Sequence, residues 1–192
     1  MKILKLCSLL LLLITACKSE TAPQSYWDEN NGEFSMSELK LCYIVPTAVE
    51  NWSIANPDSL VSGLKFFGFD SSTGICISIV APTLSSNQSK LNAFKIRELL
   101  HDIICQYPKN KILKFNPVIE PCTYFDADNW RFNAELSILE QQDTVSVFHS
   151  GYFFYIDNKP IGILATFPIS SVDSIDYKNK LQDYFDGLRK LK

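Results

Sequence analysis

The sequence predicts an α+β domain, in which a mainly antiparallel sheet of about six or seven strands is covered by helices on both faces. Short turns join most of the successive apolar runs, and strands joined by short connections are antiparallel neighbours. The run 144–156 carries large apolar side chains on both faces, so both faces need a cover. Two amphipathic segments, 88–107 and 172–191, can supply helical covers.

Seven segments have the length and composition of strands. Alternating or continuous apolar residues bounded by turn-forming residues place them at 39–45, 60–70, 74–81, 111–119, 130–139, 144–156 and 161–167. The turns at 70–74 and 157–160 predict two hairpins. The 13 Phe, 8 Tyr and 3 Trp, against 7 Gly, indicate a well-filled interior. We therefore expect a single domain over residues 38–192.

The helical covers are read from apolar residues spaced three and four apart. The first helix follows three candidate N-cap residues at 85–87. Its apolar face excludes Cys105, which falls on the polar side beside His101. The second helix begins after Ser170 and Ser171, and its apolar face is expected to comprise Tyr177, Leu181, Tyr184, Phe185, Leu188 and Leu191.

The first sixteen residues read as an export signal. Lys2 and Lys5 precede an apolar stretch at 8–14 that is too short for a permanent membrane span. The residues Ile14-Thr15-Ala16-Cys17 resemble the lipobox of bacterial lipoproteins, in which cleavage precedes the cysteine and its sulfur carries diacylglycerol. This resemblance implies lipidation at Cys17 and a membrane attachment through that lipid. An ordinary secretory signal and an uncleaved anchor are the alternatives.

Residues 17–37 are expected to form a flexible tether, because they are mostly small and polar. Position 18, the second residue of the mature chain, is a lysine. It is not the aspartate that retains lipoproteins at the inner membrane, so the outer membrane is expected, on either its periplasmic or its outer face. Removal of residues 1–16 takes away two lysines and no acid, which moves the net charge from −3 to −5. This acidic balance excludes nucleic acid as the expected partner.

Four cysteines remain in the folded part. Cys42 and Cys76 lie in apolar strand-like runs, and burial as free thiols or pairing remain open for them. Cys105 faces away from the apolar side of its helix, and an exposed thiol is a liability in an oxidising compartment. Cys122 lies in a turn-like stretch, and we expect a disulfide between Cys105 and Cys122.

The sequence offers few candidate catalytic or metal-binding residues. His101 and Cys105 share one helical face, but a metal site needs further ligands that are not adjacent in sequence. His149 lies in phase with buried positions and is expected to be a core histidine. The sequence contains no nucleophile elbow, zinc-protease helix or phosphate-binding glycine loop. We therefore expect no catalytic residues, metal or cofactor, and no enzyme activity.

The order of elements resembles the PsbP-like (Mog/PsbP) fold. The resemblance rests on the stretch 43–46 leading into Trp52, the hairpin, the mid-chain helix and the aromatic strand 152–156. It continues through the Asn158-Lys159 turn, the strand to Phe167 and a closing helix near Phe185 and Leu188. It implies a domain that binds and organises other proteins without catalysis.

The sequence therefore favours a non-catalytic cell-envelope lipoprotein that binds another envelope protein as an accessory or assembly module. One alternative is an immunity lipoprotein that neutralises a toxin, which an acidic surface patch would favour. Another is a small-ligand-binding or enzymatic domain with a pocket built from aromatic residues such as Tyr152 and Phe154, which a deep pocket with converging polar groups would favour.

Overall fold

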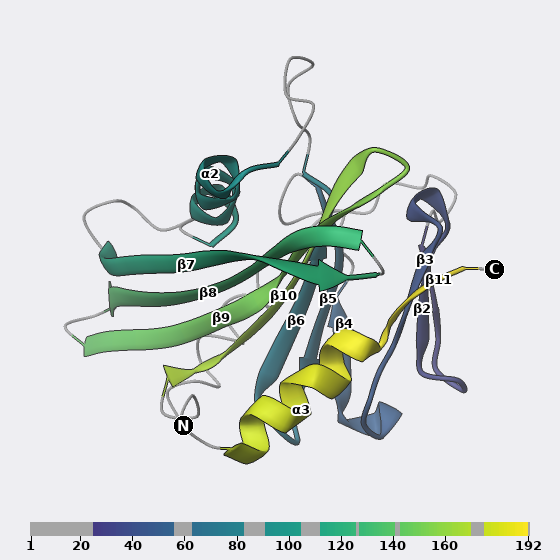
Figure 1. Cartoon of the computed structure of the whole chain (residues 1–192). Coiled ribbons are helices and arrows are strands. Elements are labelled where there is room, and N and C mark those ends of the chain that lie inside the picture. Colours follow the sequence, from purple (N-terminus) through teal and green to yellow (C-terminus); the bar gives the residue numbers. More distant parts are fainter. Residues whose placement is uncertain are drawn as a thin grey trace.

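The computed structural model describes residues 25–55, 63–82, 91–104, 112–125, 127–140, 143–169 and 175–191. Within these ranges the strands form two antiparallel sheets (Figure 1). The larger sheet has the order β4-β5-β6-β10-β9-β8-β7. Its strands are β4 (Trp52–Ala55), β5 (Leu64–Asp70), β6 (Ile75–Val80), β7 (Ile112–Tyr124), β8 (Ala127–Glu140), β9 (Asp143–Ile156) and β10 (Lys159–Pro168).

A second antiparallel sheet of four strands lies beside the larger one. It consists of β1 (Ser25–Asp28), β2 (Glu33–Met36), β3 (Leu41–Ile44) and β11 (Leu188–Lys190), in that order. The expected strand at 39–45 belongs to this second sheet, and the other three strands of the sheet were not expected. The expectation of a tether over 17–37 is therefore wrong for residues 25–36. Phe34 and Met36 alternate with polar neighbours and are buried, which gives this polar segment an apolar face. A 3-10 turn, η1 (Ser37–Leu39), connects β2 to β3, and another, η2 (Val49–Asn51), precedes β4.

Both expected helices are present, but their ends differ from the expected bounds. In α2 (Ala93–Ile104), Asn92 is the N-cap, because its side-chain oxygen accepts a hydrogen bond of 2.9 Å from the Lys95 backbone N–H. The expected caps at 85–87 lie outside the described residues. The closing helix, α3 (Ile175–Asp186), ends before Gly187, and the expected helix to residue 191 is corrected there to strand β11. No helix in the described ranges is long and apolar enough to cross a membrane.

Two apolar cores lie on opposite faces of the seven-stranded sheet. Adjacent residues of β9 show this division, because Phe153 packs in the core that contains α2 and Phe154 packs in the other. The second core joins the larger sheet to α3 and to the four-stranded sheet. The α+β class and the mainly antiparallel sheet are confirmed. The expected cover of both faces by helices is not shown, because the four-stranded sheet contributes much of the second core.

Tyr43, Val45 and Trp52 lie in the second core. The rings of Tyr43 and Trp52 meet edge to face with their centres 6.1 Å apart. The Trp52 indole N–H donates a hydrogen bond of 2.8 Å to Thr47 Oγ1, which satisfies its one donor. This contact ties the start of the larger sheet to β3.

Candidate functional site

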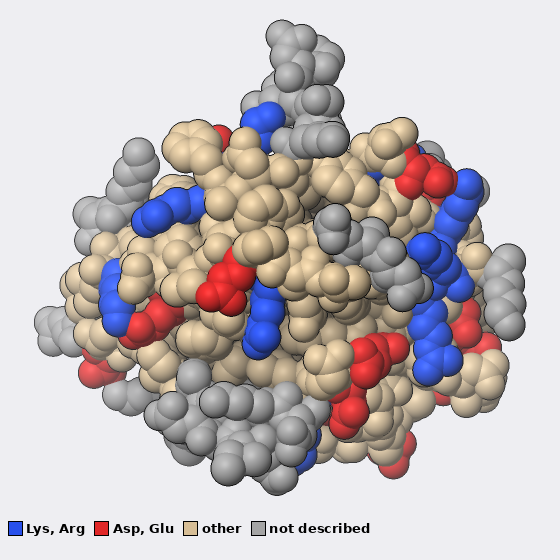
Figure 2. All heavy atoms as spheres, in the orientation of Figure 1, with Lys and Arg blue, Asp and Glu red and all other residues tan. Residues whose placement is uncertain are grey.

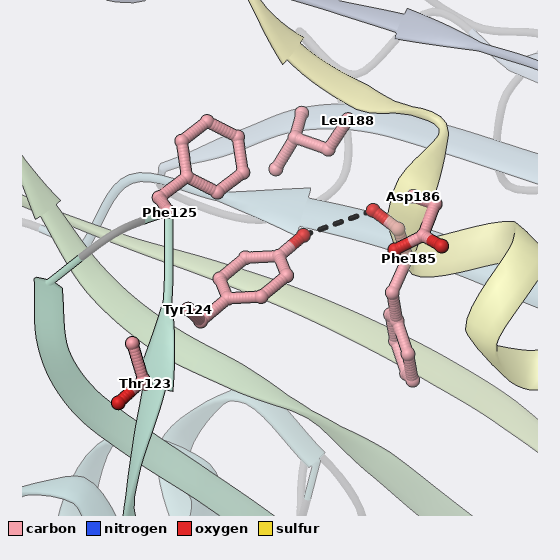
Figure 3. A pocket seen from close by; sticks show the side chains of 6 residues that line it. All are labelled: Thr123, Tyr124, Phe125, Phe185, Asp186 and Leu188. Carbon is pink, nitrogen blue, oxygen red and sulfur yellow. Dashed lines mark hydrogen bonds between the residues drawn. The ribbon is translucent and has the colours of Figure 1, made fainter.

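An open pocket of about 400 Å³ lies where the end of β7 meets the end of α3 and the start of β11 (Figure 3). We call it the aromatic pocket. It is lined by Thr123, Tyr124, Phe125, Phe185, Asp186 and Leu188. The lining residues come from two segments about sixty positions apart in the sequence, which the fold brings together.

The floor of the aromatic pocket is a stack of rings. Tyr124 lies flat on Tyr152, with 4.3 Å between ring centres and 5° between planes. Phe125 lies flat on Phe154 at 5.0 Å. The expected aromatic residues Tyr152 and Phe154 thus support the pocket from below, while the turn after β7 supplies its wall. Because these rings pack closely, the pocket ends at the floor instead of continuing into the core.

Phe125 has an unusual backbone conformation. Its φ angle is +56°, in the left-handed region that bulky side chains rarely adopt. Such a conformation costs about 1–3 kcal/mol and is concentrated at functional sites. The strained backbone holds the Phe125 ring at the edge of the pocket, where glycine or asparagine would form the same turn without strain.

The polar groups within the pocket are already engaged. The Tyr124 hydroxyl donates a hydrogen bond of 2.9 Å to the Phe185 carbonyl oxygen (Figure 3). Burial raises the pKa of the Tyr124 phenol well above its ordinary value, and the nearby Tyr152 and Asp186 act in the same direction. Burial also raises the pKa of Tyr152, against an opposing effect of Arg131. Both phenols therefore stay protonated near neutral pH.

The rim of the pocket carries opposite charges. Asp186 is exposed at one side and accepts a hydrogen bond of 2.7 Å from the Gln182 side chain. On the other side, the Lys190 ammonium lies 5.6 Å from the centre of the Phe125 ring, within the range of a cation–π interaction. An aromatic floor between charged rims is typical of a protein contact site.

A buried carboxylate holds α3 in place behind the pocket. Asp70 is fully buried and accepts hydrogen bonds from Thr47, from the Ser72 backbone and hydroxyl, and from Tyr184 of α3. The Tyr184 hydroxyl also lies 2.8 Å from Thr73 Oγ1. Because Tyr184 precedes Phe185, this network positions the pocket wall formed by the end of α3.

Both histidines lie away from the aromatic pocket. His101 is exposed on α2, and its ring meets the edge of Phe115 at 5.8 Å. His149 is buried, and its Nδ1 lies 2.8 Å from Thr166 Oγ1. Burial lowers the pKa of His149 to about 4, so the ring is neutral near pH 7. No cluster of three or more metal-ligating side chains occurs among the described residues.

The expected bond between Cys105 and Cys122 stays a prediction, because Cys105 lies outside the described residues. Cys122 is half-buried in β7 and has a free thiol there, and Cys42 is a buried free thiol.

The comparisons with known proteins concern the fold. No family model and no curated protein matches the sequence. The solution structure of cyanobacterial PsbP (CyanoP) from Synechocystis sp. PCC 6803 superposes with a TM-score of 0.54 at 11% identity, covering 92% of this chain and 98% of that chain. A crystal structure of LpqN, involved in cell envelope biogenesis of Mycobacterium tuberculosis, matches with a TM-score of 0.45 at 9% identity, covering 77% and 81%. The expected PsbP-like fold is confirmed.

Proposed function

We propose that this chain, folded as a PsbP-like domain, is a lipid-anchored module of the cell envelope that binds another envelope protein at its aromatic pocket and performs no chemistry itself. The observation that carries the proposal is the strained Phe125, whose ring stands at the edge of an open aromatic hollow. Aromatic side chains in such hollows dominate the energy of many protein interfaces. The lipid anchor rests on the Cys17 motif.

The geometry gives less support to a small-ligand or enzymatic site. A volume of about 400 Å³ is within the range of ligand sites. However, the Tyr124 hydroxyl is bonded to the backbone, and Thr123 and Asp186 lie exposed at the rim. Few polar groups therefore converge on a bound molecule, whereas a side chain of a partner protein needs only the apolar floor.

The toxin-neutralising alternative requires a concentrated acidic surface. On the face shown in Figure 2, which is the face of Figure 1, acidic and basic side chains are interspersed. Such a mixed surface favours a partner that is recognised by shape and apolar contact over one that is attracted by net charge.

Phe125→Gly should strongly weaken partner binding while the domain stays folded. Glycine relieves the left-handed backbone, which offsets the lost stacking on Phe154. Loss of an interface aromatic that contributes at least about 2 kcal/mol should lower partner recovery about 30-fold or more. The measurement is quantitative mass spectrometry of proteins recovered with the anchored chain from detergent-solubilised membranes of its own cells.

Asn158→Gly is the matched control for this experiment. Asn158 also has a left-handed backbone, with φ of +63°, but it lies in the turn between β9 and β10, outside the pocket lining. This variant should recover the partner at the wild-type level. Equal recovery by wild type and Phe125→Gly would refute binding at the aromatic pocket.

Lipidation at Cys17 is a separate prediction. Cys17→Ser should leave the chain in the soluble fraction or with its signal uncleaved, because the acyl groups attach through the cysteine sulfur. Intact-mass measurement of the mature wild-type protein should show the added acyl mass on a chain that begins at residue 17. A mature chain without that mass would contradict the anchor.

A further inference from the structure

Three lysines gather at one end of the molecule. Lys40 donates a hydrogen bond of 2.6 Å to Asp157 in the turn between β9 and β10. Lys159 follows two residues later, and the Leu191 backbone N–H donates to the Lys40 carbonyl oxygen, which brings Lys190 beside Lys40. We call Lys40, Lys159 and Lys190 the lysine cluster. On the side of the molecule where β3 and β11 lie, Figure 2 shows several basic side chains, with acidic side chains among them.

One acidic side chain joins the cluster. The hydrogen bond from Lys40 holds the pKa of the Asp157 carboxyl below its ordinary value, and the charges of Lys159 and Lys190 act in the same direction. Asp157 thus offsets one of the three lysine charges. The cluster has a local charge of about +2, although the mature chain is acidic.

The chain enters the domain at the same end. Across the four-stranded sheet, Ser25 of β1 is paired with Met36, Met36 with Leu41, and Leu41 with Lys190. Three strand spacings of about 4.8 Å place Ser25 roughly 14 Å from Lys190. The next residue, Tyr26, is 63% exposed, and tyrosine is enriched at membrane–water interfaces.

The link to the lipid is short. Only seven residues, 18–24, separate Cys17 from the first residue of β1. The eight Cα–Cα steps from Cys17 to Ser25 span about 28 Å at most when fully extended. An anchor at Cys17 therefore keeps the end of the domain with the lysine cluster close to the bilayer.

We propose that the lysine cluster lies against the anionic headgroups of the membrane that holds the lipid anchor, with Tyr26 at the interface. This inference rests on the proposed lipid anchor. It orients the domain, because the aromatic pocket adjoins Lys190 and then opens beside the membrane surface. The partner is in consequence a protein whose contact region lies at that surface.

The test measures how strongly the lysine cluster binds anionic vesicles when the chain carries no lipid anchor. The mature chain with Cys17→Ser is sedimented with vesicles of phosphatidylcholine alone or with about 30% phosphatidylglycerol, at low ionic strength. A local charge of +2 should raise the partition onto anionic vesicles about 30-fold, which corresponds to about 1 kcal/mol per charge. The double variant Lys159→Gln, Lys190→Gln should reduce this preference to near unity.

The matched control removes two positive charges elsewhere. Lys95→Gln with Arg97→Gln changes α2, on the opposite face of the larger sheet, and should keep the full preference. The proposed orientation would be wrong if the Cys17→Ser chain bound both kinds of vesicle equally. It would also be wrong if both double variants lost the preference for anionic vesicles to the same extent. The acyl mass of the wild-type protein is measured separately. A protein without lipidation at Cys17 is therefore distinguishable from a protein whose lysine cluster does not bind anionic headgroups.

Discussion

Gly151→Ala should destabilise the domain by at least about 3 kcal/mol. Gly151 lies in the middle of β9, between β8 and β10. A Cβ atom there would lie 2.0 Å from the Ile163 backbone oxygen, which belongs to the sheet and cannot move aside alone. The strand would have to shift, and with it Tyr152, which supports the floor of the aromatic pocket. The measurement is the free energy of unfolding in denaturant.

Gly74→Ala provides the comparison. A Cβ at Gly74 meets nothing within 4 Å, but the backbone has a φ of +75°. This variant should cost only the roughly 1–2 kcal/mol of the left-handed conformation. If Gly151→Ala lowered the free energy of unfolding no more than Gly74→Ala does, β9 and β10 would not approach each other as closely as described.

Asp70→Asn should cost roughly 3 kcal/mol near neutral pH, because the buried carboxylate accepts several hydrogen bonds and asparagine presents an amide to the same donors. Tyr184→Phe removes one donor and should cost about half as much. In both variants the end of α3 loses its attachment, so partner binding at the pocket should weaken as well. Unfolding and partner recovery are measured on the same preparations.

The pH dependence gives an independent check on Asp70. Burial alone would raise the pKa of its carboxyl, but the hydrogen bonds from Ser72, Tyr184 and Thr47 outweigh it and hold the pKa below the ordinary value of 3.8. The folded state then binds the proton less readily than the unfolded state. This contribution is present above pH 3.8 and is lost as the pH falls through the lowered pKa.

The stability gap between wild type and Asp70→Asn should therefore narrow as the pH falls below about 4. His149 also reduces stability in acid, because its pKa is lowered to about 4 in the folded state, but it is present in both proteins and cancels in the difference. A gap that stayed constant down to about pH 2 would show that Asp70 is not held as a carboxylate.

Six of the seven strands of the larger sheet could be predicted, because they carry strong local patterns, such as the two apolar faces around Phe153 and Phe154. The short strand β4 was not expected. The four-stranded sheet could not, because only β3 was expected as a strand, and β1 and β2 are four residues each in a segment rich in small and polar residues. The end of α3 was missed for another reason. Leu188 and Leu191 continue the apolar spacing of the helix, so the sequence predicts that the helix continues. In the structure the chain at Gly187 passes so close to β3 that a Cβ there would lie 2.3 Å from the Ile44 backbone oxygen, and only glycine is accommodated.

The site was predicted only in part. Tyr152 and Phe154 were singled out from an aromatic strand, and they pack beneath Tyr124 and Phe125 without lining the pocket themselves. Phe125 was missed, because a phenylalanine in a turn has no periodic signal and its left-handed backbone is visible only in three dimensions. The opposite wall of the pocket is formed by Phe185 and Leu188. These residues lie near Phe125 only because α3 and β11 pack against the end of β7, and no local sequence pattern predicts that packing.

The most direct test of the central claim is photo-crosslinking in the protein's own cells. A photoreactive residue at Thr123, on the exposed rim of the aromatic pocket, should give one dominant adduct with a protein at the membrane, and Phe125→Gly should abolish it. The same probe at Val118, which is 53% exposed on the same strand, should not give that adduct. An adduct at Thr123 that survives Phe125→Gly, or that Val118 gives equally, would contradict binding at the aromatic pocket.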